Sequence, residues 1–338
     1  MSNHISLKEV AQQMVLKGKG ILAADESTST CTNRLESIGV QSTFDSRNEY
    51  RDMLFSTKGI EDFISGVILF DETLRQSSTC NEKILFPEFL NSKGIIPGIK
   101  VDTGAKPLAN FNNEKITEGL DGLRDRLVEY YNLGARFAKW RAVITIGDNI
   151  PSDACILGNA HALARYAALC QESNIVPIVE PEVLMDGSHT VETCYEVTKR
   201  SLNVVFEQLV LNHVFLEGIV LKPNMIVSGK NCDVQADVNK VADMTFKCLL
   251  ENVPSEVPGI AFLSGGQSSD DATAHLLKMN EKYSNEMPWN LTYSYGRALQ
   301  HDALNAWAGS NKVAGQEALF KRAKSNSLAT YGKELTLS

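Results

Sequence analysis

The sequence has little of what marks several large classes of protein. Its apolar runs fall well short of the roughly 18 residues that a membrane-spanning helix needs. The amino terminus has no basic segment followed by an apolar one, so it carries no secretory signal pattern. The net charge of −8 argues against a nucleic-acid-binding or polybasic membrane protein. We therefore expect a cytoplasmic protein that binds neither nucleic acid nor membrane.

The spacing of the cysteines and histidines also gives no sign of disulfides or of a metal site. The seven cysteines form no C-x-x-C pair and their number is odd, so we expect reduced thiols. The six histidines are scattered without ligand spacing, so we expect no metal and no cofactor. Residues 263–267 match a signature of transporter ATPases, but the chain lacks the G-x-x-x-x-G-K-[ST] loop that such enzymes need.

A short apolar run that ends in polar or charged residues recurs along the 338 residues. Short apolar runs rich in β-branched residues are typical of buried strands. Stretches with apolar residues at helical spacing lie between several of them, at 123–131, 157–167 and 191–213. The expected strands lie at 20–24, 64–70, 96–102, 137–143, 176–182, 219–221, 259–266 and 291–297.

Eight strands that alternate with helices predict an α/β fold, and their closure gives a (β/α)8 TIM barrel. No composition shift marks a linker, so we expect a single domain over residues 1–338 with the barrel at about 20–297. A helix over residues 6–18, capped by Ser6 and ended by Gly18, would precede the barrel. A helix from about 298 to 325 and a tail to residue 338 would follow it.

Charged residues gather at the predicted strand ends, which meet at one mouth of such a barrel. Residues two apart on a strand share a face, so Lys139 and Arg141 point the same way, as do Glu180 and Glu182. A set of mixed sign on six of eight strands is hard to explain as solvated surface. The set is Asp25, Glu26, Lys100, Lys139, Arg141, Glu180, Glu182, Lys222 and Arg297.

Lys222 is central to this set. It follows the apolar run 219–221 and precedes Pro223, which ends the strand. A lysine there could simply extend to solvent. It could instead be an amine nucleophile, because burial and a neighbouring cation lower a lysine pKa. Lys139 lies two strands away with the Glu180 strand between them, which favours an amine that condenses with a ketone while a carboxylate moves protons.

Such a Schiff base allows a neighbouring C–C bond to break, and Asp25 is a candidate to take the hydroxyl proton of the departing fragment. Residues 263–268 offer backbone N–H groups after the seventh strand, where barrels often hold phosphate. Arg297 adds a forked donor after the eighth strand. On the opposite side, a second anion site could form from Ser27, Thr30 and Lys100. Two anion sites around one lysine indicate a bis-phosphorylated substrate.

Eight stretches carry a family likeness: 22–28 (LAADEST), 66–70 (GVILF), 98–102 (GIKVD), 137–141 (FAKWR), 175–182 (IVPIVEPE), 221–225 (LKPNM), 262–268 (FLSGGQS) and 294–299 (SYGRAL). Together they resemble the class I, Schiff-base fructose-bisphosphate aldolases, in order from about residue 14 to 333. The resemblance implies a metal-free glycolytic lyase. It implies cleavage of fructose 1,6-bisphosphate to dihydroxyacetone phosphate and glyceraldehyde 3-phosphate, usually by a homotetramer.

The resemblance also implies roles. Lys222 would form the Schiff base, Glu180 would be the general acid/base of its formation, and Asp25 would handle the C4 hydroxyl proton. Lys139 would assist electrostatically, and Glu182 would support the lysine network. The implied substrate-binding residues are Ser264, Gly265 and Arg297 at the C1 phosphate, Ser294 and Gly296 close by, Ser27, Thr30 and Lys100 at the C6 phosphate, and Arg141 near the latter.

Some positions depart from the family pattern. Asn33 stands where animal members have lysine, and Ser29-Thr30 where they have Gly-Ser. The last tyrosine is Tyr331, so we expect a mobile polar tail in place of a terminal tyrosine that reaches the site. Two alternatives stay open. Another Schiff-base barrel lyase, such as a transaldolase-like enzyme, would not need two phosphate sites, and an inactive scaffold would not need every catalytic position filled.

Overall fold

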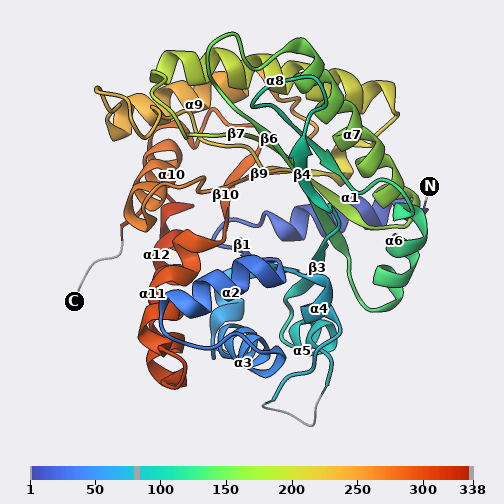
Figure 1. The fold of residues 1–338 in the computed structure, drawn as a ribbon, viewed down its shortest axis with the longest axis vertical. Coiled ribbons are helices and arrows are strands. Elements are labelled where there is room, and N and C mark those ends of the chain that lie inside the picture. Colours follow the sequence, from blue (N-terminus) through green and yellow to red (C-terminus); the bar gives the residue numbers. More distant parts are fainter. Residues whose placement is uncertain (1, 80–83, 335–338) are drawn as a thin grey trace.

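The computed structural model describes residues 2–79 and 84–334 (Figure 1). Cys80 and the end of the expected tail, residues 335–338, lie outside the described residues. Within the described part, eight parallel strands close into a barrel, in the order β1-β10-β9-β8-β7-β6-β3-β2. This confirms the predicted (β/α)8 barrel. The strands are β1 (Gly20–Ala24), β2 (Ile64–Leu69), β3 (Ile96–Lys100), β6 (Phe137–Ile144), β7 (Val176–Val183), β8 (Val220–Leu221), β9 (Gly259–Phe262) and β10 (Asn290–Tyr295).

Helices surround this barrel (Figure 1), and they pack on the strands through a large apolar core. The predicted helices 123–131, 157–167 and 191–213 correspond to α6, α7 and α8, which confirms them. The part of the chain that the structure describes has no helix long and apolar enough to cross a bilayer. The helices are α1 (Ser2–Met14), α2 (Thr28–Ser37), α3 (Phe44–Phe55), α4 (Asp71–Leu74), α5 (Phe86–Ser92), α6 (Leu123–Asn132), α7 (Asp153–Glu172), α8 (Val191–Leu211), α9 (Val238–Asn252), α10 (Ser269–Tyr283), α11 (Arg297–Trp307) and α12 (Lys312–Ala329).

Four predicted strands end earlier than expected: β2 by one residue, β3 and β10 by two, and β9 by four. In β9 and β3 the chain turns directly after the strand. β9 stops at Phe262, since Gly265 and Gly266 have φ of +58° and +109°, outside the range of a strand. β3 stops at Lys100, and the Asp102 carboxylate accepts a hydrogen bond from the backbone N–H of Gly104 at 3.1 Å. This turn leads into an antiparallel hairpin, β4 (Gly104–Pro107) and β5 (Lys115–Glu118), that the sequence analysis did not predict.

The terminal helices also differ from the predictions. α1 begins at Ser2 and ends at Met14, so Ser6 lies inside the helix and does not cap it. The predicted helix 298–325 is two helices, because Ala308 and Gly309 both have positive φ and end α11. Asn311 then caps α12 by accepting a hydrogen bond from Ala314.

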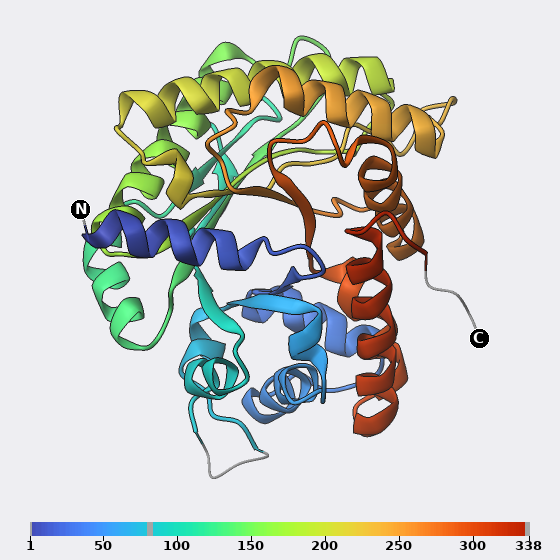
Figure 2. The same cartoon turned by 180° about the vertical axis from the view of Figure 1, so that it is seen from behind.

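α1 closes the amino end of the barrel. Figure 2 shows it crossing in front of the strands. Its buried residues recur at helical spacing and form one apolar cluster with strand residues that point into the barrel, such as Phe137 and Val176. Phe137 fills the interior so fully that a Cβ on Gly98 would lie 2.2 Å from its ring. This cluster contains Leu7, Ala11 and Met14 of α1 and Val15, the residue directly after it.

This closure predicts a stability effect that is separate from catalysis. Leu7 is 1% exposed, so Leu7→Ala should leave a cavity and lower the free energy of unfolding by about 2–4 kcal/mol. Leu16→Ala, at a side chain that is 48% exposed, is the matched control and should change it by less than about 0.5 kcal/mol. Urea denaturation measures both. A Leu7→Ala effect no larger than that of the control would contradict the packing of α1 in the barrel.

Candidate active site

Three neighbouring strands bring charged side chains into the carboxyl end of the barrel. β7 lies between β6 and β8, with Arg141 opposite Glu180 and Leu221 opposite Val179. This register turns Lys139, Glu180 and Lys222 towards one another inside the barrel. They are buried, with 5%, 3% and 3% of their surfaces exposed. The prediction that the Glu180 strand separates the two lysines is confirmed.

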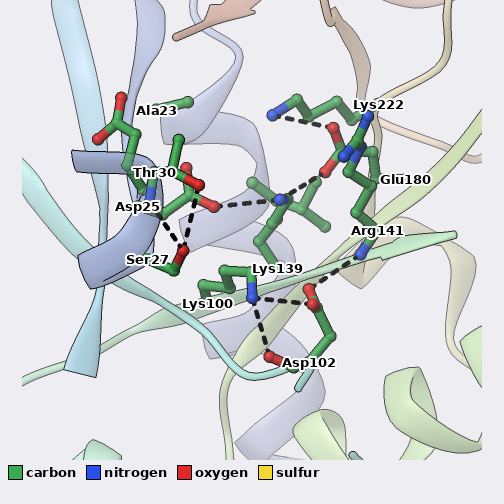
Figure 3. Close-up of polar contacts among 12 residues, drawn as sticks. Ala23, Asp25, Ser27, Thr30, Lys100, Asp102, Lys139, Arg141, Glu180 and Lys222 are labelled. Atoms are coloured by element: carbon green, nitrogen blue, oxygen red, sulfur yellow. Dashed lines mark hydrogen bonds and ion pairs between the residues drawn. The ribbon is translucent and has the colours of Figure 1, made fainter. Parts of the chain in front are cut away.

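These residues form a continuous chain of ion pairs (Figure 3). Glu180 Oε1 lies 3.3 Å from Lys222 Nζ, and its Oε2 lies 3.2 Å from Lys139 Nζ. Lys139 Nζ also donates a hydrogen bond to Asp25 Oδ2 at 3.0 Å. Lys139 therefore contacts two carboxylates, while Lys222 shares one of them.

That asymmetry moves the two lysine pKa values in opposite directions. Burial lowers the pKa of Lys222, and the Lys139 ammonium lowers it further, against the opposing effect of Glu180. Burial alone would also lower the pKa of Lys139, but Asp25 and Glu180 outweigh burial and raise it. Burial would raise the pKa of Asp25, but Lys139 and Lys222 together hold it well below its usual range. The site thus contains one lysine whose pKa is lowered beside one whose pKa is raised.

Two further ion pairs lie next to this chain, and Figure 3 shows the one between Lys100 and Asp102. Arg141 Nε donates to Glu182 Oε2, so Glu182 contacts the guanidinium rather than either lysine in this structure. Lys100 Nζ lies 2.9 Å from Asp102 Oδ1 and donates to the Asp102 carbonyl at 3.0 Å. Asp102 also accepts from the backbone N–H of Arg141 at 3.3 Å. Asp102 thus joins β3 to β6 beside the lysines.

The segment after β1 is held by a second buried charge cluster. Glu26 lies 2.6 Å from Arg51 Nη1, pairs with Arg34, and accepts from Gln300 Nε2 at 2.9 Å. Because Glu26 is the next residue after Asp25, this cluster fixes the direction in which Asp25 points. Glu26 belongs to the predicted charge set, but its contacts are with this cluster.

Ser27 and Thr30 lie at the start of α2. Ser27 Oγ caps the helix by accepting from the backbone N–H of Thr30 at 3.4 Å, and the two hydroxyl oxygens are 3.1 Å apart. Both residues line a cavity of about 300 Å³. The other residues that line it are Ala23, Asp25, Glu26, Arg34, Lys100, Asp102, Gly104, Ala105, Lys139, Arg141, Val143 and Gly296. The cavity is therefore bordered by four lysine and arginine side chains and three carboxylates.

The remaining predicted residues lie on β10 and in the segments that follow β9 and β10. Ser264 is 9% exposed, and Gly265 follows with positive φ. The Ser294 hydroxyl is buried and has no hydrogen-bond partner among the described residues. Gly296 packs against the carbonyl of β1, where a Cβ would lie 3.3 Å from the Ala23 oxygen. Arg297 begins α11 and is exposed at the mouth.

Sequence reasoning missed several residues of this region. Asp102 could have been found, because it follows Lys100 by the two residues that place side chains on one face. Arg34 could not, because its approach depends on the fold of α2 over the strand ends. Among residues 2–79 and 84–334, no group of three or more His, Cys, Asp or Glu side chains is placed to hold a metal ion.

Comparison with known proteins decides the family. The chain matches the protein-family model described as fructose-bisphosphate aldolase class-I over residues 6–336. The chain belongs to the class I fructose-bisphosphate aldolase family. It is 54% identical to a probable class 1 fructose-bisphosphate aldolase of Xanthomonas axonopodis pv. citri, over 97% of this chain and 98% of that protein. It is 50% identical to fructose-bisphosphate aldolase 1 of Toxoplasma gondii, over 97% and 90%.

A solved structure supports the same assignment. The aldolase of Plasmodium falciparum, in complex with TRAP and a small-molecule inhibitor, superposes with a TM-score of 0.96 at 47% identity. The alignment covers 99% of this chain and 96% of that one. The chain is therefore a member of a lyase family, and the resemblance drawn from its strand-end motifs is confirmed.

The opposed lysine pKa values predict a specific response to substitution. In Lys139→Met the cation beside Lys222 is lost while Glu180 and Asp25 stay, so the pKa of Lys222 should rise. Cyanate carbamylates only neutral amines, so the pH profile for labelling of Lys222, read by peptide mass spectrometry, should move to higher pH. Lys139→Arg keeps the charge and should move it less. A profile in Lys139→Met that matches the wild type would show that Lys139 does not control Lys222.

Proposed function

We propose that this chain cleaves fructose 1,6-bisphosphate reversibly to dihydroxyacetone phosphate and glyceraldehyde 3-phosphate through a Schiff base on Lys222. The observation that carries the proposal is the sharing of Glu180 between two lysines whose pKa values shift in opposite directions. A nucleophilic amine must be neutral, and a Schiff base forms next to a group that can move protons. Lys222, with its lowered pKa and its 3.3 Å contact with Glu180, meets both needs.

The reaction can then be written from these residues. The neutral Lys222 amine attacks the C2 carbonyl, and Glu180 supplies the proton with which the carbinolamine loses water. The resulting iminium accepts the electron pair of the C3–C4 bond as Asp25 takes the proton of the C4 hydroxyl. The aldehyde leaves, and the enamine is protonated at C3 and hydrolysed to release the ketone.

Lys139 and Glu182 have supporting roles in this proposal. Lys139 stays charged between Asp25 and Glu180, and its ammonium favours the ionised form of Asp25 by lowering the pKa of that carboxyl against the effect of burial. Glu182 orients Arg141 at the mouth through their ion pair. Neither residue needs to bond covalently to substrate.

The two phosphates occupy opposite sides of the mouth in this proposal. Ser27, Thr30 and Lys100 would bind the C6 phosphate, because they line the cavity beside Asp25, with Arg141 near them. The C1 phosphate would lie against the segments after β9 and β10, where backbone N–H groups and a forked guanidinium suit an anion. The residues proposed for it are Ser264, Gly265, Ser294, Gly296 and Arg297.

We also propose that residues 1–338 act as one domain in a cytoplasmic homotetramer that needs neither metal nor cofactor. The family assignment supports sugar-phosphate substrates. The homotetramer is the assembly that the resemblance to this family implies. The free cysteines of the described residues, five of them buried, agree with a reducing compartment.

Borohydride trapping tests the proposed chemistry. Incubation with dihydroxyacetone phosphate followed by borohydride should attach the three-carbon unit to Lys222, found by peptide mass spectrometry. Lys222→Met should abolish trapping and leave the protein folded, whereas Lys278→Met, at a surface lysine of α10, should trap as the wild type does. A label on Lys139 or Lys100 would refute the assignment. Activity with a monophosphate donor and none with the bisphosphate would favour the transaldolase-like alternative.

The assembly has its own test. Sedimentation or light scattering should give a particle of about four times the 37.2 kDa chain mass. A mass of one or two chains at the enzyme concentration of the activity assay would contradict the homotetramer.

A further inference from the structure

Lys230 lies in the segment between β8 and α9, and its backbone is fixed. Its N–H donates to the Met185 carbonyl at 2.8 Å. On either side, Gly229 donates to His189 at 2.8 Å and Asn231 donates to Gly187 at 2.9 Å. These three bonds tie the segment to the loop that follows β7. Lys230 is therefore held at the carboxyl end of the barrel beside the strand that carries Glu180.

The Lys230 side chain reaches over the loop after β9. A Cβ built on Gly266 would lie 3.1 Å from Lys230 Nζ and 3.1 Å from its Cε. Gly266 has φ of +109° and no side chain, so the ammonium can approach this backbone closely. Its carboxylate partner is Asp186, at 2.7 Å, and the two side chains are 45% and 63% exposed.

The same loop is held firmly from its other side. The Gln267 backbone N–H and its Nε2 both donate to the Ser264 carbonyl, at 3.0 and 3.1 Å. The buried His275 lies with its Nδ1 2.6 Å from Gln267 Oε1, and because that oxygen only accepts, Nδ1 is the donor. Lys230 thus approaches a loop whose position is set by residues other than itself.

We propose that Lys230 is a further binding residue for the phosphate held by residues 264–266, and that its ammonium moves from Asp186 to that phosphate when substrate binds. This inference rests on the proposed function, which places the C1 phosphate at this loop. An exposed ion pair contributes little free energy, so the Lys230 ammonium can leave Asp186 with only a small loss of free energy. A phosphate dianion already fixed by backbone N–H groups is the stronger acceptor. Lys230 then favours ketoses and ketones that carry a phosphate on C1.

The same Lys→Met substitution at two different exposed lysines tests the proposal. Lys230→Met should raise the KM for fructose 1,6-bisphosphate and the Kd for dihydroxyacetone phosphate by about threefold to tenfold, while kcat stays within about twofold. Lys240→Met removes an equally exposed lysine that pairs with Glu192, and should change neither constant. In the synthesis direction, the KM for glyceraldehyde 3-phosphate should be unchanged in both variants, because its phosphate lies on the other side of the mouth. Arg297→Ala provides the comparison for loss of a C1-phosphate donor.

Substitution of Asp186, the carboxylate that pairs with Lys230, should change the Kd in the opposite direction. Asp186→Asn releases Lys230, so the Kd for dihydroxyacetone phosphate should fall by about twofold to threefold, and this gain should vanish in a Lys230→Met background. Equal effects of Lys230→Met and Lys240→Met, or a Kd that Asp186→Asn leaves unchanged or raises, would overturn the proposal. Failure of the proposed function itself would be separate, because the wild type would then not trap dihydroxyacetone phosphate on Lys222.

Discussion

The whole site depends on one buried carboxylate that serves two lysines. Charges withdrawn from water are tolerated only when they are paired, so two ammonium groups inside a barrel require carboxylates at contact distance. Glu180 contacts both lysines, whereas Asp25 contacts Lys139. Against the effect of burial, the two carboxylates around Lys139 raise its pKa, whereas Lys222 contacts one of them, Glu180, and its pKa is lowered. The position of one carboxylate therefore separates the two lysine pKa values, since burial is nearly the same for both.

The barrel provides this arrangement through strands that are distant in sequence. β8 has only two residues within the described chain, so its ladder alone does not fix Lys222. The backbone N–H of Lys222 donates to Val179 at 2.8 Å, and the Pro223 carbonyl accepts from Leu263 at 3.1 Å. Lys222 is thereby tied to the strand on each side of it at the point where its own strand ends. These bonds to both neighbouring strands hold the Lys222 side chain in position although its own strand is short.

Much of the barrel and several of the site residues could be predicted from the sequence, because barrels repeat one physical pattern. Apolar runs that end in polar or charged residues marked every barrel strand, and the two-residue period placed Lys139 with Arg141 and Glu180 with Glu182 on shared faces. The β4–β5 hairpin was not predicted, because its strands carry lysines and lack clear alternation. The break at Ala308 depends on a left-handed residue that helical propensity does not anticipate. Arg34 and Lys230 were missed for a different reason: each approaches the site through a loop or helix whose path is fixed by tertiary contacts.

The α1 helix has a consequence for the order of events in the site. With Leu7, Ala11, Met14 and Val15 filling the amino end, molecules enter and leave at the carboxyl mouth. In the proposed reaction, a substrate bonded to Lys222 is held by its ketone half, and its free half lies towards the cavity beside Ser27 and Lys100. The covalent bond makes the aldehyde leave first, and because the amino end is closed, the water that hydrolyses the anchored half arrives by the path that the aldehyde has vacated. A helix at the far end of the molecule thus gives the departing aldehyde and the incoming water one shared route.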